Sequence, residues 1–127
     1  MPMNVLDPHF KSFQKNVLPI LVRRNIGVIA MKTLASGYVL RANVVTPRQA
    51  LGYVWSQPVS TIVSGIDSEQ FLETNAGLAR AFKPMSQTEQ ATVLDKTKEA
   101  ALTGEYEPFK TPPNFDGPVG RKLHGLS

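Results

Sequence analysis

The residues best suited to chemistry lie where an apolar run meets a helical pattern, in VSTIVSGIDSEQFLETN from 59 to 75. Gly65 has no Cβ, so a ligand could approach its backbone closely. Asp67 opens a helical pattern whose first N–H groups lack intrahelical partners, and such groups bind anions. A glycine before a capped helix is also a common connector, and the Asp67 carboxylate would compete with a bare phosphate. The stretch therefore predicts a phosphate or ribose contact, or a simple capped turn.

A second candidate is Lys32, at the end of the apolar run GVIAMK and the start of the loop TLASG. In folds built from parallel strands, ligands bind beyond the carboxyl ends of the strands. Lys32–Gly37 and Ser64–Ser68 would then line one rim. A lysine at this rim suits pairing with a phosphate or a carboxylate.

The two histidines are weaker candidates. His9 follows the turn-forming pair Asp7-Pro8, and His124 lies in the C-terminal tail. Both are expected to be surface residues rather than an acid or a base. The chain has no cysteine, which excludes a disulfide framework and a cysteine metal site or nucleophile.

Alternating strand and helix patterns would position these residues. GVIAMK is β-branched without polar alternation, which is typical of a strand buried on both faces of a parallel sheet. Three strands are expected, at residues 1–7, 27–32 and 60–65, and four helices, at residues 17–25, 46–56, 67–82 and 86–101. The order predicts parallel strands joined by right-handed crossovers, in an open sheet or part of a barrel.

Capping residues support three of the helices. Thr46 is a candidate N-cap followed by Pro47, and Ser86 with Glu89 forms a capping box. Asp67 with Gln70 is read as a variant of that box. The first helix has Pro19 in its first turn and Asn25 as its stop, and Gly104 ends the fourth. The expected buried positions are Ala50, Leu51, Val54 and Trp55 in the second helix, and Phe71, Leu72, Leu78, Ala79 and Phe82 in the third.

Composition limits the function classes. The 127 residues, 42% of them hydrophobic, suit one domain with a real core. The net charge is only +4, and no aromatic platform accompanies the paired cations, so no nucleic-acid partner is expected. No segment has the layout of a membrane span or a signal peptide, and a soluble, cytoplasmic protein is expected. The proline- and glycine-rich tail, 111–127, should be irregular, either draped over the body or disordered.

Four segments carry a family resemblance: MPMNVLDPHFKSF, LPILVRRNIGVIAMKTLASG, TPRQALGYVWSQPVSTIVSGIDSEQFLETNAGLARAF and EYEPFK. Their order and spacing resemble the C-terminal part of a bacterial aldo-keto reductase, over most of residues 1–110. The resemblance implies a (β/α)8 barrel that reduces aldehydes and ketones with NADPH. It makes the three strands the sixth to eighth of that barrel, and the fourth helix the extra helix that follows the barrel. Domain 1–110 would thus be a partial barrel, followed by the tail 111–127.

The resemblance also implies a cofactor site for NADP(H). Met31 takes the place of the aromatic residue that stacks on the nicotinamide ring, a contact that a polarizable thioether can also make. The remaining candidates are Lys32, Leu34 and Ser36 near the pyrophosphate, Gly65, Ile66, Asp67 and Ser68 at the adenosine phosphate, and Asn75 near the adenine. Phe71 stands where many members have an arginine for the 2′-phosphate, so a preference for the phosphorylated dinucleotide does not follow.

No residue matches the catalytic Asp, Tyr, Lys and His of that family, which precede the part represented here. The chain alone is therefore expected to be inactive and to bind the cofactor weakly or not at all. A complete barrel takes about 250 residues, and three strands cannot close, so edges and apolar faces need a cover. Self-association or an N-terminal complement would supply it. The alternative is a non-catalytic oligomeric binding or assembly module derived from the same fold.

Overall fold

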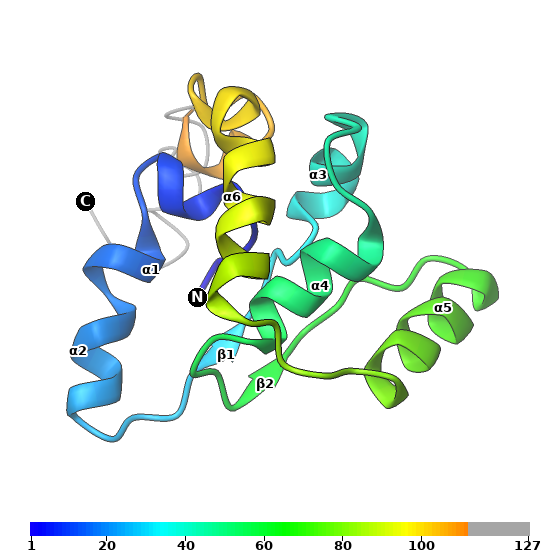
Figure 1. Ribbon diagram of the computed structural model, residues 1–127, viewed down its shortest axis with the longest axis horizontal. Helices are drawn as coiled ribbons and strands as arrows, with labels where there is room; N and C mark the ends of the chain where they lie inside the picture. The colour runs from blue at the N-terminus through cyan, green and yellow to red at the C-terminus, as the bar shows by residue number, and fades with distance from the viewer. Residues whose placement is uncertain (112–127) are drawn as a thin grey trace, which may run out of the picture.

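The computed structural model describes residues 1–111 and has a small parallel sheet at its centre (Figure 1). Strand β1 (Ile29–Ala30) pairs in parallel with β2 (Thr61–Ile62). The expected first strand, 1–7, is not formed, and only Pro2 makes a parallel bridge, with Met31 on the other side of β1. The expectation that Gly27–Lys32 and Ser60–Gly65 lie side by side in the same direction is confirmed.

Helices separate and follow these strands, as expected of an α/β chain. The helical elements are a 3₁₀ turn at Asp7–His9, α1 (Phe13–Asn16), α2 (Leu18–Arg23), a 3₁₀ turn at Ala35–Gly37, α3 (Tyr38–Arg41), α4 (Pro47–Trp55), α5 (Glu69–Arg80), α6 (Gln87–Ala101) and a 3₁₀ turn at Pro108–Lys110. The short helices α1 and α3 were not predicted. The tail 112–127, including His124, lies outside the described residues.

Most of the expected helix boundaries are confirmed. Thr46 accepts a hydrogen bond from the Gln49 amide and completes a capping box, with Pro47 in the first turn. Ser86 and Glu89 form the second box, at the start of α6. Asn25 has the left-handed backbone (φ 53°) that ends a helix, and Gly104 follows α6 with φ 71°. A Cβ on Gly104 would lie 2.6 Å from the Phe10 ring, so only glycine fits there.

The core lies on one side of the sheet. Val28 and Ala30 are buried there, together with Ala50, Leu51 and Val54 of α4. Figure 1 shows α4 and α6 in front of the two strands. The predicted burial of α4 is thus confirmed, although Trp55 is only half-buried. Tyr53, which was not predicted to be buried, is almost fully enclosed.

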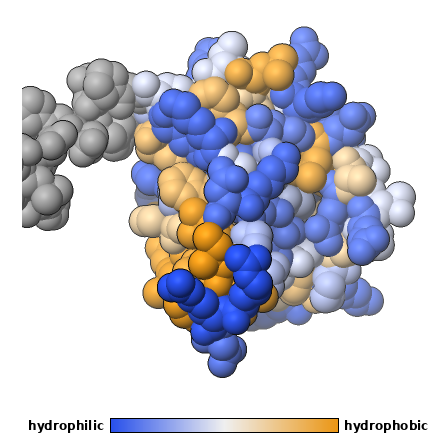
Figure 2. Space-filling view, turned by 90° about the vertical axis from the view of Figure 1, so that its left-hand side faces the viewer, coloured by the Kyte–Doolittle hydropathy of each residue, from blue (hydrophilic) through white to orange (hydrophobic). Residues whose placement is uncertain are grey.

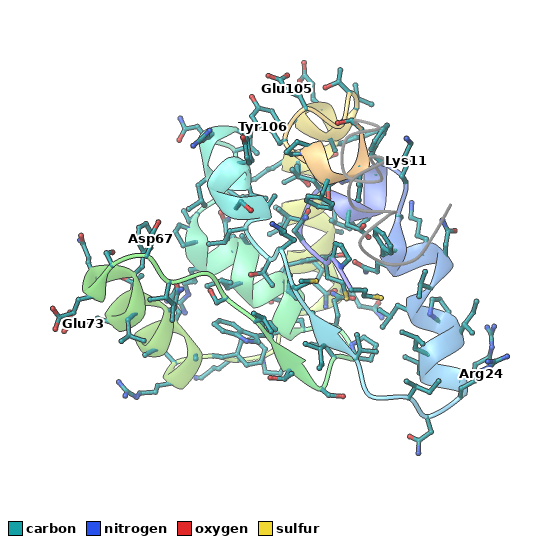
Figure 3. All side chains as sticks on the ribbon, turned by 180° about the vertical axis from the view of Figure 1, so that it is seen from behind. Lys11, Arg24, Asp67, Glu73, Glu105 and Tyr106 are labelled. Atoms are coloured by element: carbon teal, nitrogen blue, oxygen red, sulfur yellow. The ribbon has the colours of Figure 1, made fainter. Side chains whose placement is uncertain are left out.

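The other side of the sheet has no layer over it among the described residues. Ile29 is 57% exposed, Met31 43% and Val63 54%, and we call these three residues the uncovered face. The prediction that Gly27–Lys32 is buried on both faces is therefore wrong. Figure 3, drawn from behind, shows the strands in front of α4 and α6. The sequence pattern is that of a two-sided strand, but residues 1–111 supply helices to only one side.

Exposed apolar residues continue beside the sheet, on α2 and the loop after it. Ile20, Val22 and Ile26 are all exposed. Figure 2 shows hydrophobic side chains gathered next to charged ones on this side of the molecule. An exposed apolar area of this kind marks a contact surface.

Helix α5 stands apart from the body at the edge of the molecule (Figure 1). Its predicted buried stripe is wrong at Phe71 and Leu72, which are 44% and 49% exposed, and at Ala79, which is also exposed. The only buried residue of the helix is Asn75. The apolar pattern is amphipathic, yet nothing in the described residues packs tightly against it. Local periodicity therefore predicted the helix correctly and its packing incorrectly.

Three helices of the body are linked by side-chain amides. The Tyr53 hydroxyl donates to Gln14 Oε1 (2.9 Å), and Gln14 Nε2 donates to Gln57 Oε1 (3.0 Å). Gln57 Nε2 in turn donates to Gln90 Oε1 (2.9 Å). We call Tyr53, Gln14, Gln57 and Gln90 the amide chain. It runs from α1 across the end of α4 to α6.

Candidate functional site

The carboxyl end of β1 turns sharply at the loop that was predicted to contact a pyrophosphate. Lys32, Ala35 and Ser36 all have left-handed backbones, with φ of 55°, 48° and 57°. Residues with a Cβ reach this conformation at a cost of about 1 kcal/mol each. The Lys32 ammonium folds back and donates to Ser36 Oγ at 2.9 Å. The loop thereby holds one cation at the rim, bonded to an exposed hydroxyl.

The carboxyl end of β2 forms a second part of the rim. Asn75 Nδ2 donates to Ser64 Oγ at 3.0 Å and fastens α5 to the strand end. A Cβ built on Gly65 would meet no atom within 4 Å, so the space beside its backbone is open. Ile66 is also exposed. A planar or phosphate group could therefore reach the backbone here without displacing a side chain.

The start of α5 differs from the prediction. Ser68, not Asp67, is the N-cap, and its hydroxyl accepts a hydrogen bond from the Phe71 amide at 3.2 Å. The capping box of Asp67 with Gln70 is therefore wrong. A serine reaches the N3 amide as well as an aspartate does, and the chain uses the residue one position later. Figure 3 shows Asp67 at the outer end of the molecule. Its carboxylate makes no hydrogen bond to the amides of this first turn.

A cavity of about 490 Å³ lies between β2, the end of α4 and α5. Trp55, Ile62, Ile66, Leu72 and Asn75 are among its lining residues. Its walls are mainly apolar, with hydroxyl and amide groups at the strand end. A volume of this size is within the range of small-molecule sites. The cavity exists because α5 stands away from the sheet.

Eight of the nine predicted cofactor residues thus fall into two groups at the ends of neighbouring strands. Lys32, Leu34 and Ser36 form one group after β1, and the second group, Gly65–Ser68 with Asn75, follows β2. Within residues 1–111 no hydrogen bond or ion pair joins the two groups. Met31 lies on the uncovered face next to the first group. The structure brings each group together locally but does not join the two.

Sequence reasoning missed a buried polar cluster, which joins the first loop to the segment EYEPFK. The Lys110 ammonium lies 2.6 Å from Asp7 Oδ1 and 3.0 Å from Glu107 Oε2, and all three side chains are almost fully buried. Asn4 Nδ2 donates to the other Glu107 oxygen at 2.9 Å. We call Asn4, Asp7, Glu107 and Lys110 the polar clamp.

The polar clamp is fully hydrogen-bonded. Asp7 also accepts from the Ser12 hydroxyl and from the amides of Phe13 and Gln14. No side-chain nitrogen or oxygen buried in the described part of the chain lacks a partner. Burial raises the pKa of Glu107, although its contacts with Asn4 and Lys110 act in the opposite direction. Complete satisfaction of this kind is typical of a structural ion pair rather than a reactive one.

One feature of the sequence is consistent with this cluster. Glu107 and Lys110 are three residues apart in EYEPFK, a segment to which no role was assigned. Their partners are about a hundred positions away, and no local pattern connects the two. Only the fold shows that the segment docks against Asp7.

His9 is half-buried rather than on the surface as predicted. Its Nε2 lies 3.3 Å from Thr97 Oγ1, and Thr97 also donates to the Val5 carbonyl at 2.8 Å. Burial lowers the pKa of His9. The imidazole packs between the first turn and α6, away from both strand ends. These contacts indicate that His9 has a structural role.

Neither a metal-binding cluster nor a membrane-spanning helix is found in the described part of the chain. Residues 1–111 contain no group of three acidic or histidine side chains that could hold a metal ion. No helix in this range is both long enough and apolar enough to cross a bilayer.

Comparison with known proteins adds no relative: no family model, no curated protein and no solved structure matches the chain.

Proposed function

We propose that the chain is the closing part of a (β/α)8 barrel of the aldo-keto reductase type and contributes the adenosine end of an NADP(H) site. One observation carries the proposal. Three neighbouring parallel segments have helices on one side and an apolar, uncovered face on the other. Strands of a barrel wall have this character, because their inner face packs against other strands of the same barrel.

The open strand ends support the nucleotide assignment. Gly65 offers an unobstructed backbone, and Ser68 leaves the carboxylate of Asp67 away from the helix amides. The cavity beside Asn75 has apolar walls and one buried amide, which suits a purine. Lys32 supplies a cation on the neighbouring strand end, where a pyrophosphate would be bound.

The proposed chemistry is hydride transfer from the nicotinamide to a carbonyl, and this chain would contribute binding only. None of its residues matches the catalytic groups of the resembled family. Met31 lies where the nicotinamide ring would stack, but the rest of that pocket would come from other strands. The chain alone should therefore hold the adenosine end weakly and show no reductase activity.

Calorimetric titration separates this proposal from a module that binds no nucleotide. The full chain should bind NADPH and adenosine 2′,5′-bisphosphate with similar dissociation constants of about 1 mM. Reduced nicotinamide mononucleotide should not bind, because its half of the site is absent. Absence of saturation by NADPH at about 10 mM would contradict the proposal.

A pair of glycine variants shows where the nucleotide binds. Gly65→Val should abolish the heat of NADPH binding without unfolding the chain, since a Cβ there meets no protein atom. Gly77→Ala is the matched control, because Gly77 lies on α5, also in open space and away from the rim. Unchanged affinity in Gly65→Val would show that the phosphate position is wrong.

The uncovered face favours a second candidate function, a non-catalytic assembly module. A contiguous apolar face without a cover is a contact surface in either case. The full chain should therefore associate with itself in sedimentation velocity as its concentration rises. Ile29→Lys should reduce this association, whereas Ile20→Lys, also exposed but on α2, should reduce it less. A monodisperse monomer at all concentrations would contradict any role for the uncovered face. NADPH silence together with association would favour the module over the reductase segment.

A further inference from the structure

A second cavity lies on the helical side of the molecule, away from the rim. It has a volume of about 440 Å³ and lies between α4, the segment that follows α5 and the first half of α6. None of the nine predicted cofactor residues lines it. We call this cavity the helical pocket. A ligand of the helical pocket would therefore be distinct from the proposed nucleotide.

A glycine forms part of the pocket floor where the fold does not require one. Gly52 is buried in the middle of α4, a position where glycine destabilises a helix relative to alanine. A Cβ there would make only an ordinary contact, 3.6 Å from Met85 Sδ. Neither a close contact nor a positive φ demands glycine. The missing side chain leaves room in the pocket instead.

Aromatic rings form one wall of the helical pocket. Trp55 and Phe82 lie with their ring centroids 5.4 Å apart and their planes tilted by 52°. Both line the cavity, with Met85 and Val93 beside them. Tilted aromatic rings and a thioether offer good packing to another ring. The wall therefore favours a ligand with an aromatic or other flat apolar body.

The charged residues at the pocket favour an anion. Arg48 and Lys83 line it, and within residues 1–111 the only ion pairs are those of Lys110. The one acidic lining residue, Glu89, accepts hydrogen bonds from the Ser86 amide (2.7 Å) and hydroxyl (2.8 Å). Those bonds lower the pKa of Glu89 and hold its carboxylate at the start of α6. The two cations thus lack a protein counterion in the described structure.

We propose that the helical pocket binds a small aromatic carboxylate, with the ring against Trp55 and Phe82 and the carboxylate at Arg48 and Lys83. A pocket with an aromatic wall and a few charged groups at its edge is a common form of small-molecule site, and here two cations face one carboxylate that Ser86 already binds. Arg48 can hold the carboxylate by two parallel hydrogen bonds. The proposal is independent of the nucleotide site and survives if that site fails.

Fluorescence of Trp55, the single tryptophan of the chain, detects binding, and the variants described below assign it to the helical pocket because Trp55 lines both cavities. Phenylbutyrate is the probe, and phenylbutanol is the matched neutral compound. Phenylbutyrate should change the emission saturably with a dissociation constant below about 1 mM, and phenylbutanol should bind at least about fivefold more weakly. Equal binding of the two compounds, or no saturation by phenylbutyrate at about 10 mM, would overturn the proposal.

Variants assign the binding to this pocket. Arg48→Gln with Lys83→Gln should weaken phenylbutyrate at least about fivefold and leave phenylbutanol unchanged. Lys96→Gln, an exposed cation of α6 outside the pocket, is the charge control and should change neither. Gly52→Ala should fold, because its Cβ makes no close contact, and should weaken both compounds by filling the floor. A double variant that behaves like Lys96→Gln would show that the carboxylate does not bind at these cations.

Discussion

The polar clamp and the rim both collect charged and amide side chains, but they differ in burial. In the polar clamp, Asp7, Glu107 and Lys110 are almost fully enclosed and every polar atom has a partner. At the rim, Lys32 makes one hydrogen bond to an exposed serine, and Gly65 borders open space. Removing one member of such a buried, fully paired group destabilises the fold. Because every polar atom already has a partner, none is left to bind a ligand.

The difference indicates which cluster a ligand can use. The polar clamp contains more charged groups than the rim, and by charge alone it would be the better candidate for a ligand site. Its buried, paired geometry excludes a ligand, since any entrant must break several hydrogen bonds. The rim is weaker in charge but accessible. Four variants test this contrast, two in the polar clamp and two at the rim.

Removal of the clamp cation should have the largest effect. Lys110→Met leaves the buried Asp7 carboxylate without its ion pair, and about 3 to 5 kcal/mol of unfolding free energy should be lost. Urea denaturation followed by circular dichroism measures the loss. Lys98→Met, at an exposed position on α6, is the control and should cost less than about 1 kcal/mol. Equal effects of the two variants would show that the polar clamp is not structural.

The polar clamp should also respond to pH through Glu107. Burial raises the pKa of this carboxyl in the folded state, so its contribution to stability is complete below the unfolded pKa. That contribution is lost as pH rises through the folded pKa. The stability of the native chain relative to Glu107→Gln should therefore fall as pH rises above about 4. Glu105→Gln, at an exposed position, should give no such difference in the same denaturation series.

At the rim, loss of the Asn75 amide should free α5 with little global effect. The hydrogen bond to Ser64 contributes about 1 kcal/mol, and the better helix propensity of alanine offsets about half of this. Asn75→Ala should therefore keep the overall unfolding midpoint but speed tryptic cleavage after Arg80. Thr74→Ala, an exposed change on the same helix, should leave the cleavage rate unchanged. Slow cleavage in both variants would show that α5 is held by other contacts.

The smallest effect should be a gain in stability. Ser36 has a left-handed backbone that glycine adopts without strain, so Ser36→Gly should stabilise the chain by up to about 1 kcal/mol. Ser36→Ala keeps the strain and removes the hydroxyl that accepts from Lys32, which makes it the control. Thermal denaturation of the two variants separates backbone strain from the hydrogen bond. A loss of stability in Ser36→Gly would show that the hydroxyl matters more than the backbone.

Local chemistry made much of the fold predictable. Thr46 and Ser86 satisfy the first amides of their own helices through partners three residues away, so their caps could be read directly. The parallel order of the strands followed from their alternation with helices. The capping prediction at Asp67 failed because two adjacent residues, Asp67 and Ser68, could both serve, and the sequence alone does not rank them.

Packing between distant segments was not predictable. The apolar pattern of Gly27–Lys32 is typical of a strand with a packed layer on each face. It does not show which of the two layers is absent from the described residues. Phe71 and Leu72 belong to an apolar pattern that predicts an amphipathic helix. How exposed they are depends on the distance between α5 and β2, which the pattern does not show. Lys110 meets Asp7 only through the complete fold. For the site, the strand ends and their residue types could be predicted, but the cavity beside α5 could not.

The amide chain has a consequence for how the molecule opens. Each of its three glutamines both donates and accepts. Helix α1 cannot leave α4 without breaking two of these bonds, and α6 cannot leave without breaking a third. These helices should exchange their backbone hydrogens with solvent at one common slow rate, as a single cooperative unit. Helix α5 lies outside this amide chain, is fastened by the hydrogen bond from Asn75 to Ser64, and should exchange faster. The moving part of the protein would then be the one that borders the open strand ends.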